Sequence, residues 1–317
     1  MQSFVGKRRG EATYDWGKLA NEPGSPPKVR GSGRHLSAEP HLPYKVDTHY
    51  HFLPQVYRAA LEKAGGDPSG WPTPDWSPEA SLQSMVNNGI QKAILSLTAP
   101  GASIAPDIES ARVLAREINN YAASLHGVTL FTRLFTPIWE ELNARKAIVF
   151  IHPTHPVNTT WTNPILPQPV IDYPHETTRT AVDLVISNVT QKFPDCPKIL
   201  SHAGGSLPYL ISRIATTSKA TESTELMYGK PSQEIKGDFQ SFYYDLALSS
   251  SPAVLNMVLD LVPNDHITYG SDFPYADSDK IAGFREDLDA FHMGRRLRET
   301  IYRRNMENPI RSRKHVR

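Results

Sequence analysis

Short apolar runs rich in β-branched residues alternate, from Pro43 onward, with longer segments whose apolar residues recur at helical spacing. The runs predict seven strands and the longer segments predict helices between them. The expected strands are Lys45–His51, Lys92–Thr98, Gly127–Phe131, Ala147–His152, Lys198–His202, Phe242–Leu248 and His266–Asp272. The expected helices are Ser77–Asn88, Asp107–Leu125, Thr136–Arg145, Thr177–Phe193, Ser206–Thr217 and Pro252–Leu261.

Strand–helix alternation is typical of βαβ crossovers and therefore predicts an α/β protein with a parallel sheet. Two such architectures are common, the doubly wound nucleotide-binding sheet and the closed barrel. The sequence has neither a Gly-x-Gly-x-x-Gly turn after a strand nor a Walker loop, which counts against the first. A (β/α) barrel is favoured, and its chemistry is expected at the C-terminal ends of the strands.

Polar residues stand at the C-terminal ends of four of the seven predicted strands: His49 and His51, His152, His202, and Asp272. His49 and His51 are two residues apart, so their side chains lie on one face of a strand and can share a metal ion. Each residue also has a purely structural interpretation, as a satisfied core histidine, a loop start or a helix cap. Together they converge on one mouth of a closed barrel, which favours a catalytic divalent metal.

Composition restricts the remaining choices. The 317 residues carry a formal net charge of +1, which gives no field that would favour nucleic acid or an anionic membrane. No apolar run approaches the roughly 18 residues of a membrane span. The single cysteine, Cys196, excludes an internal disulfide and suits a reducing compartment, so a cytoplasmic protein is expected. We predict a disordered tail over residues 1–43, a barrel over 44–305 and a solvated basic tail over 306–317.

Seven segments of the chain form a recognisable series of motifs: Val46–Pro54, Asp67–Pro72, Trp76–Glu79, Leu95–Gly101, Phe150–Thr154, Ser201–Gly205 and Gly270–Pro274. In this order, they resemble the amidohydrolase superfamily and specifically its decarboxylase branch, which includes aminocarboxymuconate-semialdehyde decarboxylase. The aromatic Trp-Pro and Ala-Pro-Gly segments are most similar to the 6-methylsalicylate decarboxylase group. The resemblance runs from about Tyr44 to about Asn305.

The resemblance implies a Zn²⁺ ion, with Mn²⁺ as the other candidate, bound by His49, His51, His152 and Asp272. His202 matches a catalytic histidine beside the metal. The family also implies a substrate-binding role for Arg213, which matches an arginine that reaches the substrate carboxylate across a homodimer interface. An ordinary charge on a helix surface explains Arg213 equally well.

Two departures from the family bear on function. Ser81 and Gln83 occupy places where the muconate-semialdehyde enzymes carry arginines, so an aromatic monocarboxylate is a better substrate than a dicarboxylate. The segment Ala102–Ala147 is also shorter than its counterpart and leaves room for one strand–helix unit fewer. We therefore predict a (β/α)8 TIM-type barrel of the amidohydrolase kind that lacks one internal unit and has seven strands.

The predicted activity is metal-dependent, non-oxidative decarboxylation of a small aromatic carboxylic acid of the hydroxybenzoate type, such as 6-methylsalicylate. His202 or Asp272 would deliver the proton that replaces the carboxylate. One alternative is a metal-dependent hydrolase of the same superfamily. Another is a catalytically impaired variant, truncated within its barrel, that survives as a binding or oligomerising protein.

Overall fold

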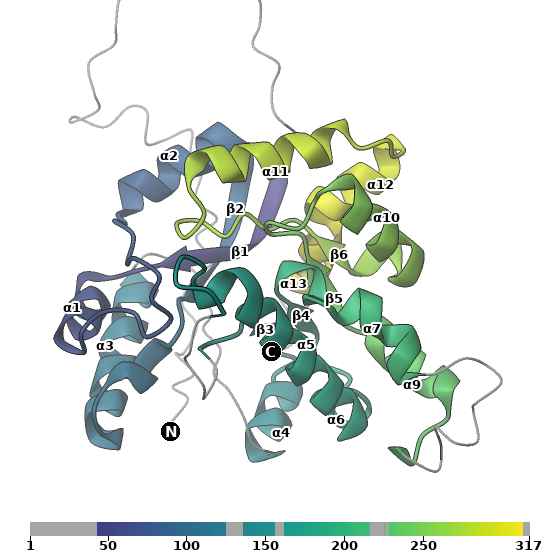
Figure 1. Cartoon of the computed structure of the whole chain (residues 1–317), viewed down its shortest axis with the longest axis horizontal. Helices are drawn as coiled ribbons and strands as arrows, with labels where there is room; N and C mark the ends of the chain where they lie inside the picture. Colours follow the sequence, from purple (N-terminus) through teal and green to yellow (C-terminus); the bar gives the residue numbers. More distant parts are fainter. Residues whose placement is uncertain (1–42, 125–135, 156–161, 216–224, 226–227, 313–317) are drawn as a thin grey trace, which may run out of the picture.

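The structure is a computed structural model that describes residues 43–124, 136–155, 162–215, 225 and 228–312. Parallel strands form its centre, and helices pack around them (Figure 1). The described residues form six strands: β1 (Lys45–Phe52), β2 (Ile90–Leu97), β3 (Val149–Ile151), β4 (Lys198–Leu200), β5 (Tyr243–Asp245) and β6 (Ile267–Thr268). They confirm six of the seven predicted strands, while Gly127–Phe131 lies outside the described residues.

The six strands follow one another in the order β2-β1-β6-β5-β4-β3. Strands β3 to β6 form one parallel sheet, and β1 pairs in parallel with β2. The two sheets meet where β1 lies beside β6 and the segment after it, because Thr48 N donates to Tyr269 O at 2.9 Å and His51 N donates to Phe273 O at 2.7 Å. This parallel order brings the C-terminal ends of all six strands to one side of the molecule.

Helices fill the connections. They are α1 (Gln55–Lys63), α2 (Pro78–Asn88), η2 (Gly101–Ile104), α3 (Ile108–Ser124), α4 (Thr136–Ala144), α5 (Gln168–Ile186), α6 (Val189–Lys192), η3 (His202–Gly204), α7 (Leu207–Ile214), α9 (Ser232–Gln240), α10 (Pro252–Leu261), η5 (Asn264–His266), α11 (Ser278–Ala290), α12 (Arg295–Glu299), η6 (Thr300–Arg304) and α13 (Asn305–Ser312). Within the described residues, no helix is both long enough and apolar enough to cross a membrane.

Helix α2 shows how local sequence sets a boundary. Ser77 caps its start by accepting a hydrogen bond from Ala80 N at 3.1 Å, and Pro78 occupies the first turn. Gly89 ends the helix in the left-handed conformation, with φ of 67°. These signals are local, and the predicted helix Ser77–Asn88 is confirmed to within one residue.

Helix α5 is longer than predicted. A helix was expected from Thr177, but α5 begins at Gln168, so the predicted start is wrong by nine residues. The additional residues include Pro174, although proline lacks an N–H and is poorly tolerated inside helices. The structure keeps Pro174 within the helix, and Thr178 Oγ1 donates to Pro174 O at 2.9 Å. The additional turns carry Tyr173, which reaches the site described below.

The C-terminal segment packs against the barrel. Residue 306 was predicted to begin a solvated tail, but residues 305–312 form α13, and Met306 is only 2% exposed. Met306 packs with Val46 of β1 and Ile199 of β4, and Phe150 packs against the same cluster. Phe150 in turn contacts the ring of His49 at a centroid distance of 4.9 Å. Helix α13 therefore packs against the strands and, through Phe150, is connected to the candidate site.

Replacing Met306 with alanine is expected to lower the free energy of unfolding by about 2–4 kcal/mol, because it empties a buried position that the cluster cannot refill. Met257→Ala on α10 is the matched control. Met257 is 39% exposed, so its replacement should lower the free energy of unfolding much less. Urea unfolding of both variants measures the difference. Equal effects at the two positions would show that α13 does not contribute to the core.

Candidate active site

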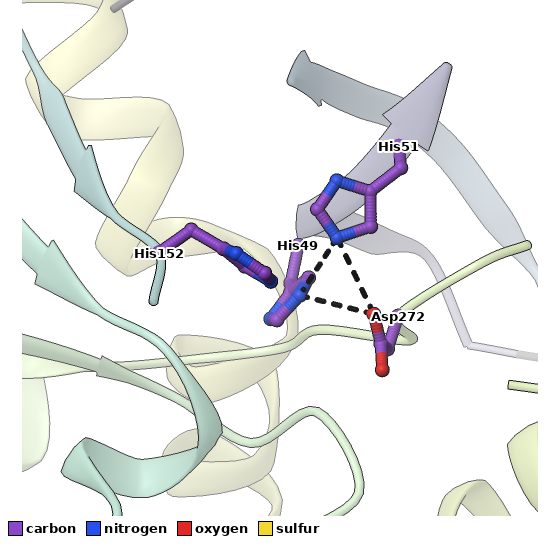
Figure 2. A group of neighbouring side chains, drawn as sticks. All are labelled: His49, His51, His152 and Asp272. Carbon is purple, nitrogen blue, oxygen red and sulfur yellow. Dashed lines mark hydrogen bonds and ion pairs between the residues drawn. The ribbon is translucent and has the colours of Figure 1, made fainter. Parts of the chain in front are cut away.

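Four side chains from three separate places in the chain converge at the C-terminal ends of the strands. His49 and His51 come from β1, His152 follows β3 directly, and Asp272 lies in the segment after β6. Each offers one ligand atom, and these atoms all lie within 4.8 Å of one another. Figure 2 shows the imidazole and carboxylate groups facing a common centre. The convergence predicted from the sequence is confirmed.

The distances within this cluster suit a shared cation. His49 Nε2 lies 3.2 Å from His51 Nε2 and 3.1 Å from Asp272 Oδ1, and His51 Nε2 lies 3.4 Å from the same oxygen. The ring of His152 meets those of His49 and His51 edge-on, at centroid distances of 5.1 and 4.8 Å. Three imidazoles and one carboxylate around one point form a donor set that zinc accepts and that other divalent metals share.

The other ring nitrogen of each histidine has its own partner. His49 Nδ1 lies 3.1 Å from Asp245 Oδ2, and His51 Nδ1 lies 3.1 Å from Ser96 Oγ. His152 Nδ1 lies 2.7 Å from the carbonyl oxygen of Pro153. Ligand histidines in metalloproteins are oriented by such contacts, which leave Nε2 for the metal. This arrangement of second partners is therefore what a metal site requires.

The charges in the cluster also favour a cation. Burial opposes a charge on His49, but the carboxylates of Asp245 and Asp272 outweigh it and raise the pKa of His49 to about 10. Burial lowers the pKa of His51 and, together with the neighbouring imidazoles, holds the pKa of His152 well below its usual range. Burial would raise the pKa of Asp272, but His49 and His51 reverse this and hold it well below its usual range. A divalent ion would replace the proton at His49 Nε2.

His202 lies beside the four-residue cluster without belonging to it. It follows β4 at the start of η3, with its ring centroid 4.7 Å from that of His49 and 6.2 Å from that of His152. Its Nδ1 donates to Ala247 O at 3.1 Å, which leaves Nε2 for another partner. Burial and the nearby charge of His49 lower the pKa of His202.

A glycine permits the close approach of α5 to this turn. A Cβ at Gly205 would lie 1.9 Å from Pro174 O, so no other residue fits there, and the glycine φ is +64°. Through this contact α5 carries Tyr173 to a ring distance of 6.1 Å from His152. The ring of Tyr275 lies 5.6 Å from that of His51. Two aromatic rings therefore border the cluster.

Two acidic residues were missed by the sequence analysis. Asp245 is fully buried at the end of β5 and contacts His49, and Asp47 is fully buried on β1, where its Oδ1 accepts from His49 N at 2.9 Å. Both stand at buried strand positions, where an ionisable residue is rare unless it has a specific partner. That signal was present in the strand predicted at Phe242–Leu248, but nothing in the sequence identified the partner.

Arg213 is not brought into the cluster by this chain alone. It lies exposed in the last turn of α7. Within the described part of the chain, no hydrogen bond or ion pair joins it to His49, His51, His152 or Asp272.

Comparison with known proteins identifies the family. Residues 123–307 match the family model described as amidohydrolase. A 6-methylsalicylic acid decarboxylase from Penicillium expansum is 40% identical in an alignment of 296 positions that covers 78% of this chain and 90% of that protein.

Solved structures show the same fold. A crystal structure of an amidohydrolase II is 24% identical, with a TM-score of 0.75 over 84% of this chain and 99% of that one. A dihydroxybenzoic acid decarboxylase from Polaromonas, solved with manganese and the inhibitor 2-nitroresorcinol, is 20% identical, with a TM-score of 0.70 over 84% and 96% of the two chains. The chain has the TIM-barrel fold of this superfamily and belongs to the amidohydrolase family.

Proposed function

We propose that this protein is a metal-dependent decarboxylase that removes the carboxyl group of a small aromatic hydroxy acid, with 6-methylsalicylate as the first candidate substrate. The observation that carries the proposal is the cluster of His49, His51, His152 and Asp272 beside His202, in a chain 40% identical to a 6-methylsalicylic acid decarboxylase. The metal would be Zn²⁺, which suits a three-nitrogen, one-oxygen set, with Mn²⁺ as the other candidate.

A divalent ion held by these residues would supply positive charge that binds and orients the substrate carboxylate and the neighbouring hydroxyl group of the ring. The chain itself must then deliver a proton to the ring carbon as CO₂ leaves. The ring of His202 lies beside that of His49, and because Ala247 O engages its Nδ1, its Nε2 is left for the substrate. Asp272 is the other group placed to carry this proton. Either assignment accounts for the products, which are CO₂ and a phenol.

The surroundings of the cluster support an aromatic substrate. The rings of Tyr173 and Tyr275 border it, and planar side chains of this kind pack well against a benzene ring. Gln83 is exposed on α2 and donates to Asn87 Oδ1 at 2.8 Å, so it does not offer a site for a second carboxylate. A monocarboxylate is therefore favoured over a dicarboxylate.

Incubating the purified protein with 6-methylsalicylate tests the function. The proposal requires release of CO₂ and formation of 3-methylphenol in equal amounts, followed by gas analysis and chromatography. Turnover of ester, lactone or amide substrates without CO₂ release would instead support a hydrolase of the same superfamily. Metal analysis of the same preparation distinguishes both from a non-catalytic protein, which would contain no metal at the cluster.

Arg213 would reach the active site of a second copy in a homodimer. Arg213 lies on the exposed face of α7, together with Tyr209, which is 77% exposed. The neighbouring start of α5 presents further apolar side chains to solvent, and Ser206 Oγ contacts His175 Nδ1 at 3.1 Å across the two helices. The apolar residues are Ile165 at 88%, Val170 at 50% and Ile171 at 38% exposure. Exposed apolar residues that lie together are typical of a protein–protein interface.

Arg213→Ala is expected to lower kcat/KM by about 10- to 100-fold, since a charge-assisted hydrogen bond contributes about 1.5–3 kcal/mol. The dimer itself should persist in light scattering, because one exposed arginine contributes little to association. Arg179→Ala is the control, as Arg179 on α5 is exposed and paired with Glu176. Unchanged kinetics for Arg213→Ala would leave it an ordinary surface charge.

A barrel that lacks one strand–helix unit remains part of the proposal. The alignment with the Penicillium expansum protein runs over 296 residues, whereas 78% of 317 residues is about 247, so roughly 49 aligned positions have no counterpart in this chain. One unit of an eight-fold barrel takes about 30 residues. Within the described residues β2 pairs only with β1, and Ile90 is its only buried residue, whereas all eight residues of β1 are buried. We therefore expect the unaltered protein to have a low free energy of unfolding, which the urea experiment with Met306→Ala also measures.

We further propose a cytoplasmic location. The support is indirect: the chain has a single cysteine, the buried Cys196, so it cannot form an internal disulfide. Proteins of reducing compartments do not depend on disulfides.

A further inference from the structure

Asp245 joins two parts of the candidate active site that are far apart in the sequence. It is the last residue of β5 and is fully buried. Its Oδ2 lies 3.1 Å from His49 Nδ1, and its Oδ1 accepts hydrogen bonds from His202 N at 3.2 Å and Ala247 N at 2.9 Å. One carboxylate thus contacts a residue of the metal cluster and the backbone that carries the adjacent histidine.

We propose that Asp245 is a positioning residue that fixes His49 as an Nε2 ligand and seats His202 beside it. The second half of this inference rests on the proposed function, because it takes His202 to act in catalysis. Asp245 would touch neither substrate nor metal and would act through the two histidines alone.

The first effect follows from the chemistry of the contact. A carboxylate accepts hydrogen bonds and does not donate them, so His49 Nδ1 must carry a proton. In the neutral ring the lone pair is then on Nε2, the atom that faces His51 Nε2 and Asp272 Oδ1. Asp245 therefore selects the tautomer of His49 that can bind a metal.

The second effect concerns the backbone at His202. His202 has φ of 52°, in the left-handed region that residues other than glycine seldom adopt. Asp245 Oδ1 accepts hydrogen bonds from the backbone N–H groups of His202 and Ala247. The carbonyl oxygen of Ala247 in turn accepts a hydrogen bond from His202 Nδ1. The turn after β4 and the segment after β5 are tied together at this oxygen.

The packing leaves Asp245 little freedom to move. A Cβ built at Gly270 would lie 2.9 Å from His49 Cβ, 3.1 Å from Ala247 Cβ and 3.1 Å from Asp245 Oδ1. Any larger residue at position 270 must therefore displace one of these groups. Gly270 offers a way to disturb the pair without removing the carboxylate.

Asp245→Asn tests the proposal by keeping the shape of the side chain and changing one acceptor into a donor. An amide cannot serve both His49 Nδ1–H and the two backbone N–H groups, so one contact becomes donor against donor. We expect the affinity for Zn²⁺ or Mn²⁺, titrated by calorimetry into metal-free protein, to fall by about 10- to 100-fold. Long-range ¹H–¹⁵N spectra of the Zn²⁺-loaded proteins should show His49 changing tautomer, and kcat at saturating metal should fall as well.

Asp238→Asn is the matched control, because Asp238 on α9 is also buried but pairs with Lys230 and not with a residue of the cluster. It should lose stability without losing metal affinity. If Asp245→Asn does not fold, Gly270→Ala replaces it as the test variant. Its Cβ crowds Asp245 Oδ1 and His49 Cβ, so it should also weaken metal binding. Wild-type affinity and an unchanged His49 tautomer in the folded variant would overturn the proposal. Metal binding is measured without substrate, so an unaltered protein that binds metal but releases no CO₂ would contradict the proposed function alone.

Discussion

Replacing His202 with alanine is expected to lower turnover by about 10²- to 10⁴-fold, the usual contribution of a positioned acid–base group. The metal content should change little, because His202 lies outside the four-residue cluster and its ring contacts that of His49 at 4.7 Å between centroids. Rates of CO₂ release at saturating substrate, together with metal analysis of the same sample, measure both effects.

His266→Ala is the control for this substitution. His266 precedes β6 at the opposite end of the strand from the active site and pairs with exposed Asp265. Its loss should leave the rate unchanged. A His202→Ala variant that retained full turnover would remove His202 from the mechanism and leave Asp272 as the group that delivers the proton.

Removing the metal, or one of its ligands, should have the largest effect on activity. His152→Ala takes one imidazole from a set whose ligand atoms lie within 4.8 Å of one another. Loss of a group that only orients a ligand costs about 10- to 100-fold in metal affinity, and loss of the ligand itself should cost more. We expect the variant to be purified with little metal and to release no measurable CO₂.

Chelation of the unaltered protein provides the reversible counterpart. Activity should disappear with the metal and return when Zn²⁺ or Mn²⁺ is added, whereas His152→Ala should not recover at the same concentration. His292→Ala, at an exposed histidine between α11 and α12, should behave as the unaltered protein does. Full activity in chelated, metal-free protein would refute the metal-dependent mechanism.

Regular segments were predicted well because their signals are local. The buried run at β1 and the capping residues of α2 lie within a few positions of the elements they specify. The early start of α5 and the packing of α13 were missed for the opposite reason. Pro174 is tolerated inside α5, and Met306 is buried only because Val46 and Ile199 lie beside it in the folded chain.

The four candidate metal ligands could be identified because each one has a recognisable place in the sequence. His49, His51, His152 and Asp272 stand at or just after the ends of strands, and parallel strands bring such ends together. Asp245 could not be placed in this way. Its partner, His49, is 196 residues away, and a strand pattern does not state which nitrogen a carboxylate will meet.

The sequence alone therefore determined the strand–helix alternation, the family resemblance and the four residues that could hold a metal, since all of these depend on residue type and local spacing. Tertiary structure decided which groups orient those residues. It placed Asp245 between His49 and His202, held His202 in a left-handed turn, and set Tyr173 and Tyr275 at the border of the cluster. These relations depend on contacts between distant segments, which exist only once the chain has folded.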